Sequence, residues 1–187
     1  MESKTTYFGT VGSENTSETL RIARQRSLEL GIKNIIVAST TGDTAVRAMD
    51  ALQGLRVIVV THVSGFRAPD TQEFTEDSRR IVESQGGIVV TAAHAFAGIS
   101  RAMSNKYNMP GPGYLIADTL RIFGQGMKVA VEVALMAADA GVVRTDEDVV
   151  SVGGTSCGAD TAIVLMPVPS HHFFDVRVKE VLCKPRF

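Results

Sequence analysis

The sequence has no tryptophan, only two cysteines and no excess of charge of either sign. Cys157 and Cys183 alone cannot build the disulfide framework of a small secreted protein, so a reducing cytoplasm is the expected location. The 19 lysines and arginines nearly balance the 20 aspartates and glutamates. A chain with this balance and without a run of basic residues is not expected to bind nucleic acid or an anionic membrane through charge.

Long hydrophobic runs are missing as well. The most apolar stretch, residues 129–140, is interrupted by Glu132 and Asp139 and is shorter than the roughly 18 residues of a membrane span. The first residues lack the apolar core of a secretory signal. No Gly-x-x-x-x-Gly-Lys-[Ser/Thr] run occurs, which excludes a P-loop NTPase. The four histidines show no metal-ligand spacing, so we expect no metal site.

What the sequence does contain is a repeating pattern of strand, loop and helix. Short continuous apolar runs at 35–38 and 57–60 predict strands that are buried on both faces. The first helix is expected to begin at Asn15, which has the spacing of a capping box with Glu18, and to end at Gly31. Further helices are expected over about 44–53, 71–85, 95–106, 114–123 and 127–140, and further strands over 88–90, 149–152, 161–166 and, half-exposed at an edge, 175–179. The alternation predicts a single α/β domain over residues 1–187 with a mostly parallel sheet.

The loop after the first buried strand is the first candidate binding site, because ligands of open parallel sheets bind beyond the carboxyl ends of the strands. This loop reads Ser39-Thr40-Thr41-Gly42-Asp43-Thr44-Ala45. It offers hydroxyl groups, a glycine that allows close approach of the backbone, and the unpaired N–H groups of a helix N-terminus, which together suit a phosphate. The alternative, equally compatible with this loop by itself, is that Asp43 or Thr44 only caps the helix.

A second loop of similar composition follows a later strand. It reads Gly153-Gly154-Thr155-Ser156-Cys157-Gly158-Ala159-Asp160, and its three glycines leave little side chain to obstruct a flat or phosphorylated ligand. The alternative is a tight hairpin between two strands. Two such loops in one small sheet favour a ligand cleft more than either loop does alone.

A few other residues could contribute to a site. Thr61 and His62, like His94, lie just past predicted strands, where they could touch a ligand, although a histidine there is more often only structural. Lys128 opens a helix and could reach an anion, but a solvated lysine is the commoner case. Cys157 has no base nearby in the sequence to support a role as a nucleophile. The sequence therefore names no catalytic residue.

The stretch from Ile35 to Ala45, followed by a helix and the strand 56–61, resembles the C-terminal α/β domain of pyruvate kinase. In that domain a strand, a T-x-[ST]-G-x-[ST]-A loop and a helix hold the phosphate of an effector. Ser39, Thr41, Gly42, Thr44 and Ala45 fit this pattern, whereas Asp43 adds a carboxylate that is unfavourable beside a phosphate unless it points away or caps the helix. From Phe8 onward the chain is similar to a stand-alone archaeal family with this fold, mostly described as uncharacterised, especially over 42–45, 123–129, 136–139 and 158–162.

The resemblance implies a three-layer α/β/α fold, with a mostly parallel sheet and one antiparallel strand near an edge. It also implies FMN as the bound ligand, because members of the stand-alone family are known as FMN binders. It does not imply pyruvate kinase activity, since the barrel that carries phosphoryl transfer has no room in 187 residues.

We therefore expect a protein that binds FMN or another phosphorylated small molecule, with the phosphate on the first loop. The second loop, through Gly153, Gly154, Thr155, Gly158 and Ala159, is expected to approach the ring or the ribityl chain. The alternatives are a regulatory module that senses a sugar phosphate without chemistry of its own and an assembly domain whose loops are only turns and caps. A chain this apolar, with helices at its periphery, is also compatible with a homodimer or a larger assembly.

Overall fold

The structure is a computed structural model that describes residues 2–186. Its strands are β1 (Thr6–Phe8), β2 (Asn34–Ala38), β3 (Arg56–Val60), β4 (Ile88–Val90), β5 (Val149–Gly153), β6 (Thr161–Met166) and β7 (Arg177–Pro185). Its α-helices are α1 (Thr16–Leu30), α2 (Asp43–Ala51), α3 (Glu76–Ser84), α4 (Gly98–Tyr107), α5 (Pro112–Arg121) and α6 (Gln125–Asp139), and two short 3₁₀ helices are η1 (Ser13–Asn15) and η2 (Ser170–Asp175). No helix within the described residues is long and apolar enough to cross a membrane.

The strands form one sheet in the order β1-β7-β6-β5-β2-β3-β4. β5, β2, β3 and β4 are paired in parallel, and β1 is parallel to β7. β6 is antiparallel to both of its neighbours, β5 and β7. The α/β fold with a mostly parallel sheet and an antiparallel strand near one edge is thus confirmed.

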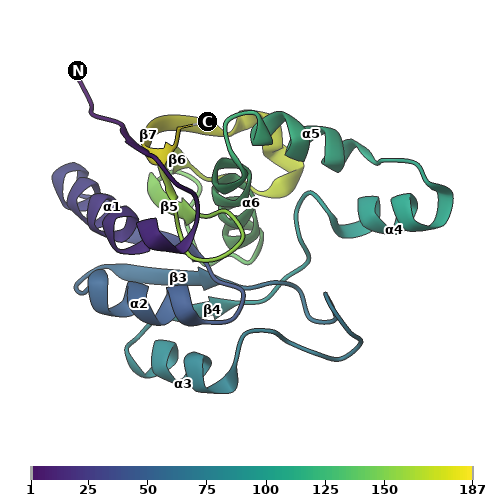
Figure 1. Cartoon of the computed structure of the whole chain (residues 1–187), viewed down its shortest axis with the longest axis horizontal. Coiled ribbons are helices and arrows are strands. Elements are labelled where there is room, and N and C mark those ends of the chain that lie inside the picture. Colours follow the sequence, from purple (N-terminus) through teal and green to yellow (C-terminus); the bar gives the residue numbers. More distant parts are fainter. Residues whose placement is uncertain (1, 187) are drawn as a thin grey trace.

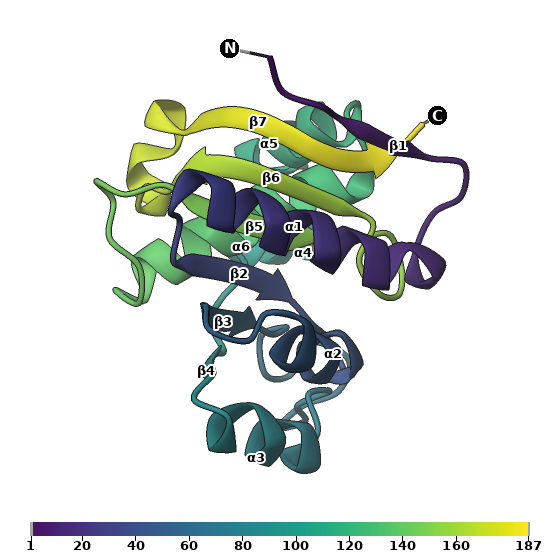
Figure 2. The same ribbon diagram turned by 90° about the vertical axis from the view of Figure 1, so that its left-hand side faces the viewer.

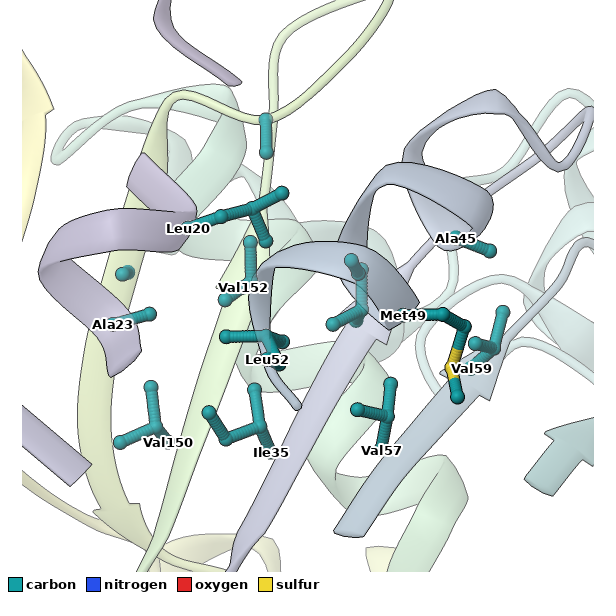
Figure 3. Packing of buried hydrophobic residues seen from close by; sticks show 14 of the residues in the cluster. Leu20, Ala23, Ile35, Ala45, Met49, Leu52, Val57, Val59, Val150 and Val152 are labelled. Carbon is teal, nitrogen blue, oxygen red and sulfur yellow. The ribbon is translucent and has the colours of Figure 1, made fainter. Parts of the chain in front are cut away.

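Helices cover both faces of the sheet, with α1, α2 and α3 on one side and α5 and α6 on the other (Figures 1 and 2). Alternate side chains of a strand point to opposite faces. In β2, Ile35 packs under α1 and α2, whereas the next residue, Ile36, packs under α6. Figure 3 shows the first of these cores, where Leu20 of α1 and Leu52 at the end of α2 lie over β2 and β5. Burial of each such side chain contributes roughly 1.5–3 kcal/mol, which explains the continuous apolar runs of the central strands.

Some local predictions are wrong at the level of single residues. Asn15 does not cap α1 with its side chain, because its amide donates to the carbonyl oxygen of Thr10 at 2.9 Å, and Glu18 pairs with Arg21 instead of closing a capping box. The helix expected from 71 begins only at Glu76, after Thr75, whose hydroxyl accepts the N–H of Ser78 at 3.2 Å. The segment before Thr75 is therefore loop.

The edge beside β7 was also only partly foreseen. The three-residue strand β1 was not predicted, and it pairs only with Cys183–Pro185 at the end of β7. The beginning of β7 is left exposed, as the alternating sequence over 175–179 indicates. In the middle of the chain, α4 projects from the body of the molecule (Figure 1), and none of its residues is buried.

Candidate functional site

The loop between β2 and α2 ends in a helix N-terminus that is partly open. Gly42 occupies the N-cap position with φ of 114°, a conformation that favours glycine. The hydroxyl of Ser39 accepts the N–H of Ala45 at 3.3 Å, and this bond satisfies one N–H group of the first turn. Within the described residues no acceptor takes the N–H groups of Asp43 and Thr44. Neither Asp43 nor Thr44 caps the helix with its side chain: Ser39 accepts one N–H group of the first turn, and the N–H groups of Asp43 and Thr44 are left without an acceptor in the described chain.

Helix α3 holds this loop in place from outside. The N–H of Thr75 donates to the carbonyl oxygen of Thr41 at 3.2 Å. A methyl group added to Gly42 would lie 2.2 Å from the side chain of Ser78, so the glycine is required for packing against α3 as well as for its backbone conformation. Asp43 accepts the hydroxyl of Thr41 at 2.9 Å, and this bond occupies the carboxylate that the sequence places beside the helix N-terminus.

The end of β3 brings an imidazole to the same loop. Nε2 of His62 lies 3.3 Å from the hydroxyl of Thr40, and Nδ1 lies 2.8 Å from Oε2 of Glu73. The other oxygen of Glu73 accepts from Nε of Arg67 at 2.7 Å. Thr61 itself is buried, and its hydroxyl bonds within the protein, at 2.7 Å from the hydroxyl of Thr91. Of the two predicted residues, His62 therefore faces the loop and Thr61 supports the strand end.

A pocket of about 250 Å³ lies beside His62 and is lined by its neighbours Phe66 and His94 and by Arg101. The His62 ring lies 4.4 Å from that of Phe66 and 5.2 Å from that of His94, and the Arg101 guanidinium lies 4.5 Å from the centre of the Phe66 ring. The remaining walls are small or apolar, from Val63, Gly65, Ala93, Ala97 and Gly98. The pocket thus offers flat rings and one guanidinium beside the β2–α2 loop.

His94 is held in its neutral form in this pocket. Burial lowers the pKa of the His94 imidazole, and the nearby negative charge of Glu132 only partly opposes this shift. The N–H of Val63 points at Nε2 of His94 across 3.3 Å, which requires an unprotonated nitrogen there. His94 therefore presents an uncharged ring to the pocket.

The second predicted loop is a hairpin connection, because β5 and β6 pair in antiparallel fashion with Gly153 opposite Thr161. Asp160, which is fully buried, holds this loop in place through hydrogen bonds. Its carboxylate accepts the N–H groups of Gly12 at 2.9 Å and Thr155 at 3.2 Å and the hydroxyl of Thr161 at 2.8 Å. The hairpin alternative weighed for this loop thus describes its geometry, and any contact of the loop with a ligand stays a prediction.

Close packing within the protein explains why Gly153 and Gly154 of the hairpin are glycines. A methyl group on Gly153 would lie 2.4 Å from the carbonyl oxygen of Gly126, and one on Gly154 would lie 2.2 Å from that of Gly158. Ala159 is buried, and its N–H donates to the hydroxyl of Thr16 at 3.0 Å. The hydroxyl of Thr155 is buried without a hydrogen-bond partner among the described residues, and the Cys157 thiol is exposed.

Lys128 lies on the opposite face of the sheet, on α6, and is buried there. Its ammonium group forms an ion pair with Glu132, whose other oxygen accepts the N–H of Phe96 at 3.1 Å. This ion pair neutralises the ammonium charge of Lys128, which the sequence analysis considered for binding an anion. No group of three or more metal-ligating side chains lies together in residues 2–186.

The structure brings together more residues at this site than sequence reasoning named. Phe66, Glu73 and Arg101 were missed, and they come from an irregular loop and from α4, where no periodic pattern singles out a residue. His94 could be found by its place after a strand, like His62. Position at a strand end thus points to His62 and His94, whereas the sequence carries no comparable signal for residues that long loops bring next to them.

Comparison with known proteins gives the family. The family described as the pyruvate kinase alpha/beta domain matches residues 17–165 of the 187. Among solved structures, the chain is similar to a pyruvate kinase from Cryptosporidium parvum, with a TM-score of 0.44 and 12% identity over 82% of this chain and 23% of that one. It is also similar to the Cryptosporidium parvum pyruvate kinase in complex with ADP, with a TM-score of 0.40 and 14% identity over 80% of this chain and 22% of that one. The chain thus spans less than a quarter of either pyruvate kinase. Because the family match covers most of its length, this chain belongs to the pyruvate kinase alpha/beta domain family.

Proposed function

We propose that this protein binds a phosphorylated small molecule at the N-terminus of α2. The observation that carries the proposal is the pair of N–H groups, from Asp43 and Thr44, that no acceptor in the described chain takes. They lie beside the hydroxyls of Thr40 and Thr41 at the carboxyl ends of parallel strands, where open α/β sheets bind ligands. A helix N-terminus of this kind attracts phosphate through its N–H groups and its dipole.

FMN is the ligand we propose first. Its phosphate would lie on the β2–α2 loop, and its flat ring has an apolar pocket next to His62, with the rings of Phe66 and His94 side by side at 5.2 Å. A pocket of about 250 Å³ suits the ring part of such a ligand rather than the whole molecule. The chain would then be a flavoprotein whose reaction is open.

The first experiment identifies whatever is bound. The purified protein is denatured by heat, and the released material is analysed by fluorescence and mass spectrometry. Flavin fluorescence with a mass that contains one phosphate supports the proposal. A colourless protein that releases only a sugar phosphate contradicts the FMN part.

The second experiment locates the phosphate with Thr41→Glu, which sets a carboxylate at an exposed position before the helix N-terminus. Thr44 is less suitable for this test because its side chain is only 7% exposed. A like charge near the phosphate costs about 1–4 kcal/mol, depending on solvent screening, so we expect roughly a fivefold to thousandfold weaker FMN binding. Thr119→Glu, on the exposed surface of α5, is the matched control. Equal affinity in both variants would contradict this location.

A second candidate function is a regulatory module that binds a sugar phosphate without catalysing a reaction. The family match favours it, because the fold is that of the pyruvate kinase alpha/beta domain. Under this alternative, a sugar phosphate raises the melting temperature of a colourless protein, whereas FMN does not. Thermal melts with each compound separate the two candidates.

We also propose that the protein acts in the cytoplasm as a homodimer or a larger assembly. What supports the assembly is a set of exposed apolar side chains on and beside α4 and α5, namely Ile99, Leu115 and Ile122. Interaction surfaces bury apolar groups of this kind, and α4 and α5 are neighbours in the fold. Light scattering of the purified protein measures its mass directly, and a monomer at all concentrations would contradict this part.

A further inference from the structure

Three side chains at the edge of the sheet form a hydrogen-bonded relay that phosphate binding does not need. The hydroxyl of Thr40 lies 3.3 Å from Nε2 of His62, and Nδ1 of the same ring lies 2.8 Å from Oε2 of Glu73. A hydroxyl, an imidazole and a carboxylate in this sequence have the geometry by which proteins activate a hydroxyl as a nucleophile. We propose that Thr40, His62 and Glu73 form a catalytic site for hydrolysis of carboxylic esters with a small apolar acyl or aryl group.

Glu73 fixes the state of the imidazole. Its carboxylate can only accept, so Nδ1 of His62 carries a hydrogen, and in the neutral imidazole Nε2 then has its lone pair toward Thr40. The side chain of Glu73 is 13% exposed, and its second oxygen is held by Nε of Arg67 at 2.7 Å. Glu73 is therefore a positioning residue, and His62 and Thr40 are the groups that would meet the substrate.

The N-terminus of α2 supplies backbone N–H groups that can stabilise the negative charge formed during attack on an ester. Attack on an ester develops negative charge on the carbonyl oxygen, and backbone N–H groups with the positive end of a helix stabilise that charge. Thr40 lies in the short loop between β2 and α2, and the N–H groups of Asp43 and Thr44 have no acceptor in the described chain. The inference shares these N–H groups with the proposed phosphate site but does not depend on FMN as the ligand.

The pocket beside His62 indicates the substrate class. Its volume is about 250 Å³, and Val63, Phe66, Ala93 and Ala97 give it a mostly apolar wall. Two of the residues that line it, Phe66 and His94, have rings 4.4 and 5.2 Å from that of His62, so the pocket adjoins the relay through these two rings. A short aliphatic or single-ring aromatic group fits there, whereas a long acyl chain does not.

The reaction balances with water as the only co-reactant. The oxygen of Thr40 bonds to the acyl carbon while its proton passes to Nε2 of His62. The bond from the acyl carbon to the alcohol oxygen then breaks, and that oxygen takes the proton from Nε2. Water repeats the sequence, giving one proton to Nε2 and its oxygen to the acyl carbon, and Thr40 leaves with the proton. The products are one acid and one alcohol.

The test measures hydrolysis of p-nitrophenyl acetate and p-nitrophenyl benzoate by the full chain. Thr40→Val and His62→Gln should each lower the rate by about a hundredfold or more, and Thr40→Ser should keep most of it. Glu73→Gln should lower kcat and leave KM within a few fold, because its role is to orient His62. Mass spectrometry after rapid quenching should find one acyl group on Thr40.

Free imidazole also cleaves these esters, so a matched histidine control is needed. His172 pairs with Asp175 at 3.4 Å on the surface, and its side chain is 58% exposed. His172→Gln should leave the rate unchanged, and Thr119→Val should do the same for the loss of a hydroxyl. Circular dichroism and a thermal melt show that each variant is folded. If Glu73→Gln does not fold, Thr40→Val and His62→Gln decide the question.

Two outcomes would overturn the inference. One is a wild-type rate that does not exceed the buffer rate for either ester, and the other is an equal loss in His62→Gln and His172→Gln. FMN titration of Thr40→Val and Thr41→Glu tests the phosphate proposal separately. Hydrolysis without FMN binding, or FMN binding without hydrolysis, therefore shows which proposal fails. If both hold, inorganic phosphate should inhibit hydrolysis competitively, because it would occupy the same N–H groups.

Discussion

Two loops of similar composition leave the same edge of the sheet, and they differ in what their backbone hydrogen bonds do. The loop 39–42 runs into α2 and leaves two N–H groups of the first turn without an acceptor in the described chain. The hairpin loop 154–160 turns back into β6, and its backbone is bound by the buried carboxylate of Asp160. Glycine and threonine content therefore does not distinguish the two loops, whereas their unsatisfied backbone donors do.

Among the variants that test this comparison, Asp160→Ala is expected to have the largest effect, a loss of stability. The change removes three hydrogen bonds to a fully buried carboxylate and leaves the N–H groups of Gly12 and Thr155 without their acceptor. We expect the free energy of unfolding to fall by about 3 kcal/mol or more, measured by urea unfolding. Asp146→Ala, at an exposed ion pair with Arg144, should leave it nearly unchanged. A small loss in Asp160→Ala would mean that the hairpin does not depend on its carboxylate.

A smaller loss of stability is expected from Gly158→Ala. Gly158 has φ of 71°, and a methyl group there would lie 2.5 Å from Cα of Ser13 and from the hydroxyl of Thr16. Clash and backbone strain together should cost roughly 2–4 kcal/mol. Gly141→Ala is the matched control, since Gly141 has φ of 68° but nothing lies within 4 Å of an added methyl group. Equal losses in the two variants would show that strain alone, without packing, accounts for the hairpin glycine.

Asp43→Asn is expected to strengthen ligand binding at the loop 39–42. The change removes a negative charge from the first residue of α2, beside the N–H groups proposed to hold a phosphate. With the screening of an exposed site, about 1 kcal/mol is expected, or roughly a fivefold tighter binding of FMN or inorganic phosphate in a titration. Asp50→Asn, on the last turns of the same helix, is the control. Weaker binding in Asp43→Asn would argue that the carboxylate itself contacts the ligand.

The smallest effect is expected from the cysteines. Cys157 is exposed in the hairpin, so Cys157→Ser should change ligand affinity by no more than a few fold. Burial raises the pKa of the Cys183 thiol to about 12, so a thiol reagent at pH 8 should label Cys157 and reach Cys183 only after unfolding.

The raised pKa of the Cys183 thiol also determines the direction in which folding stability changes with pH. The unfolded chain releases this thiol proton near pH 9, before the folded protein does. The stability contributed by the protonated thiol is therefore complete below pH 9 and is lost as the pH rises toward 12. Urea unfolding of wild type and Cys183→Ala across this range should show the loss in the wild type alone.

The elements of the fold could be predicted from the sequence because their signals are local. The apolar runs that became β2 and β3 follow from burial on both faces, and Gly31 ends α1 in the left-handed conformation at φ of 69°. The same reasoning placed the β2–α2 loop at the carboxyl edge of the sheet. It failed for the start of α3, because residues 71–75 belong to the loop that carries Glu73.

The sequence by itself determined the order of the strands β2 to β7 and of the α-helices, and the loop that begins α2, since periodicity and turn residues act over a few positions. Only the tertiary structure decided that β6 pairs antiparallel to β5, which makes the glycine-rich loop a hairpin. It also decided that Lys128 is paired with Glu132 and that Thr40 meets His62 across neighbouring strands. These contacts depend on sheet register and on the paths of long loops, which nearby residues do not encode.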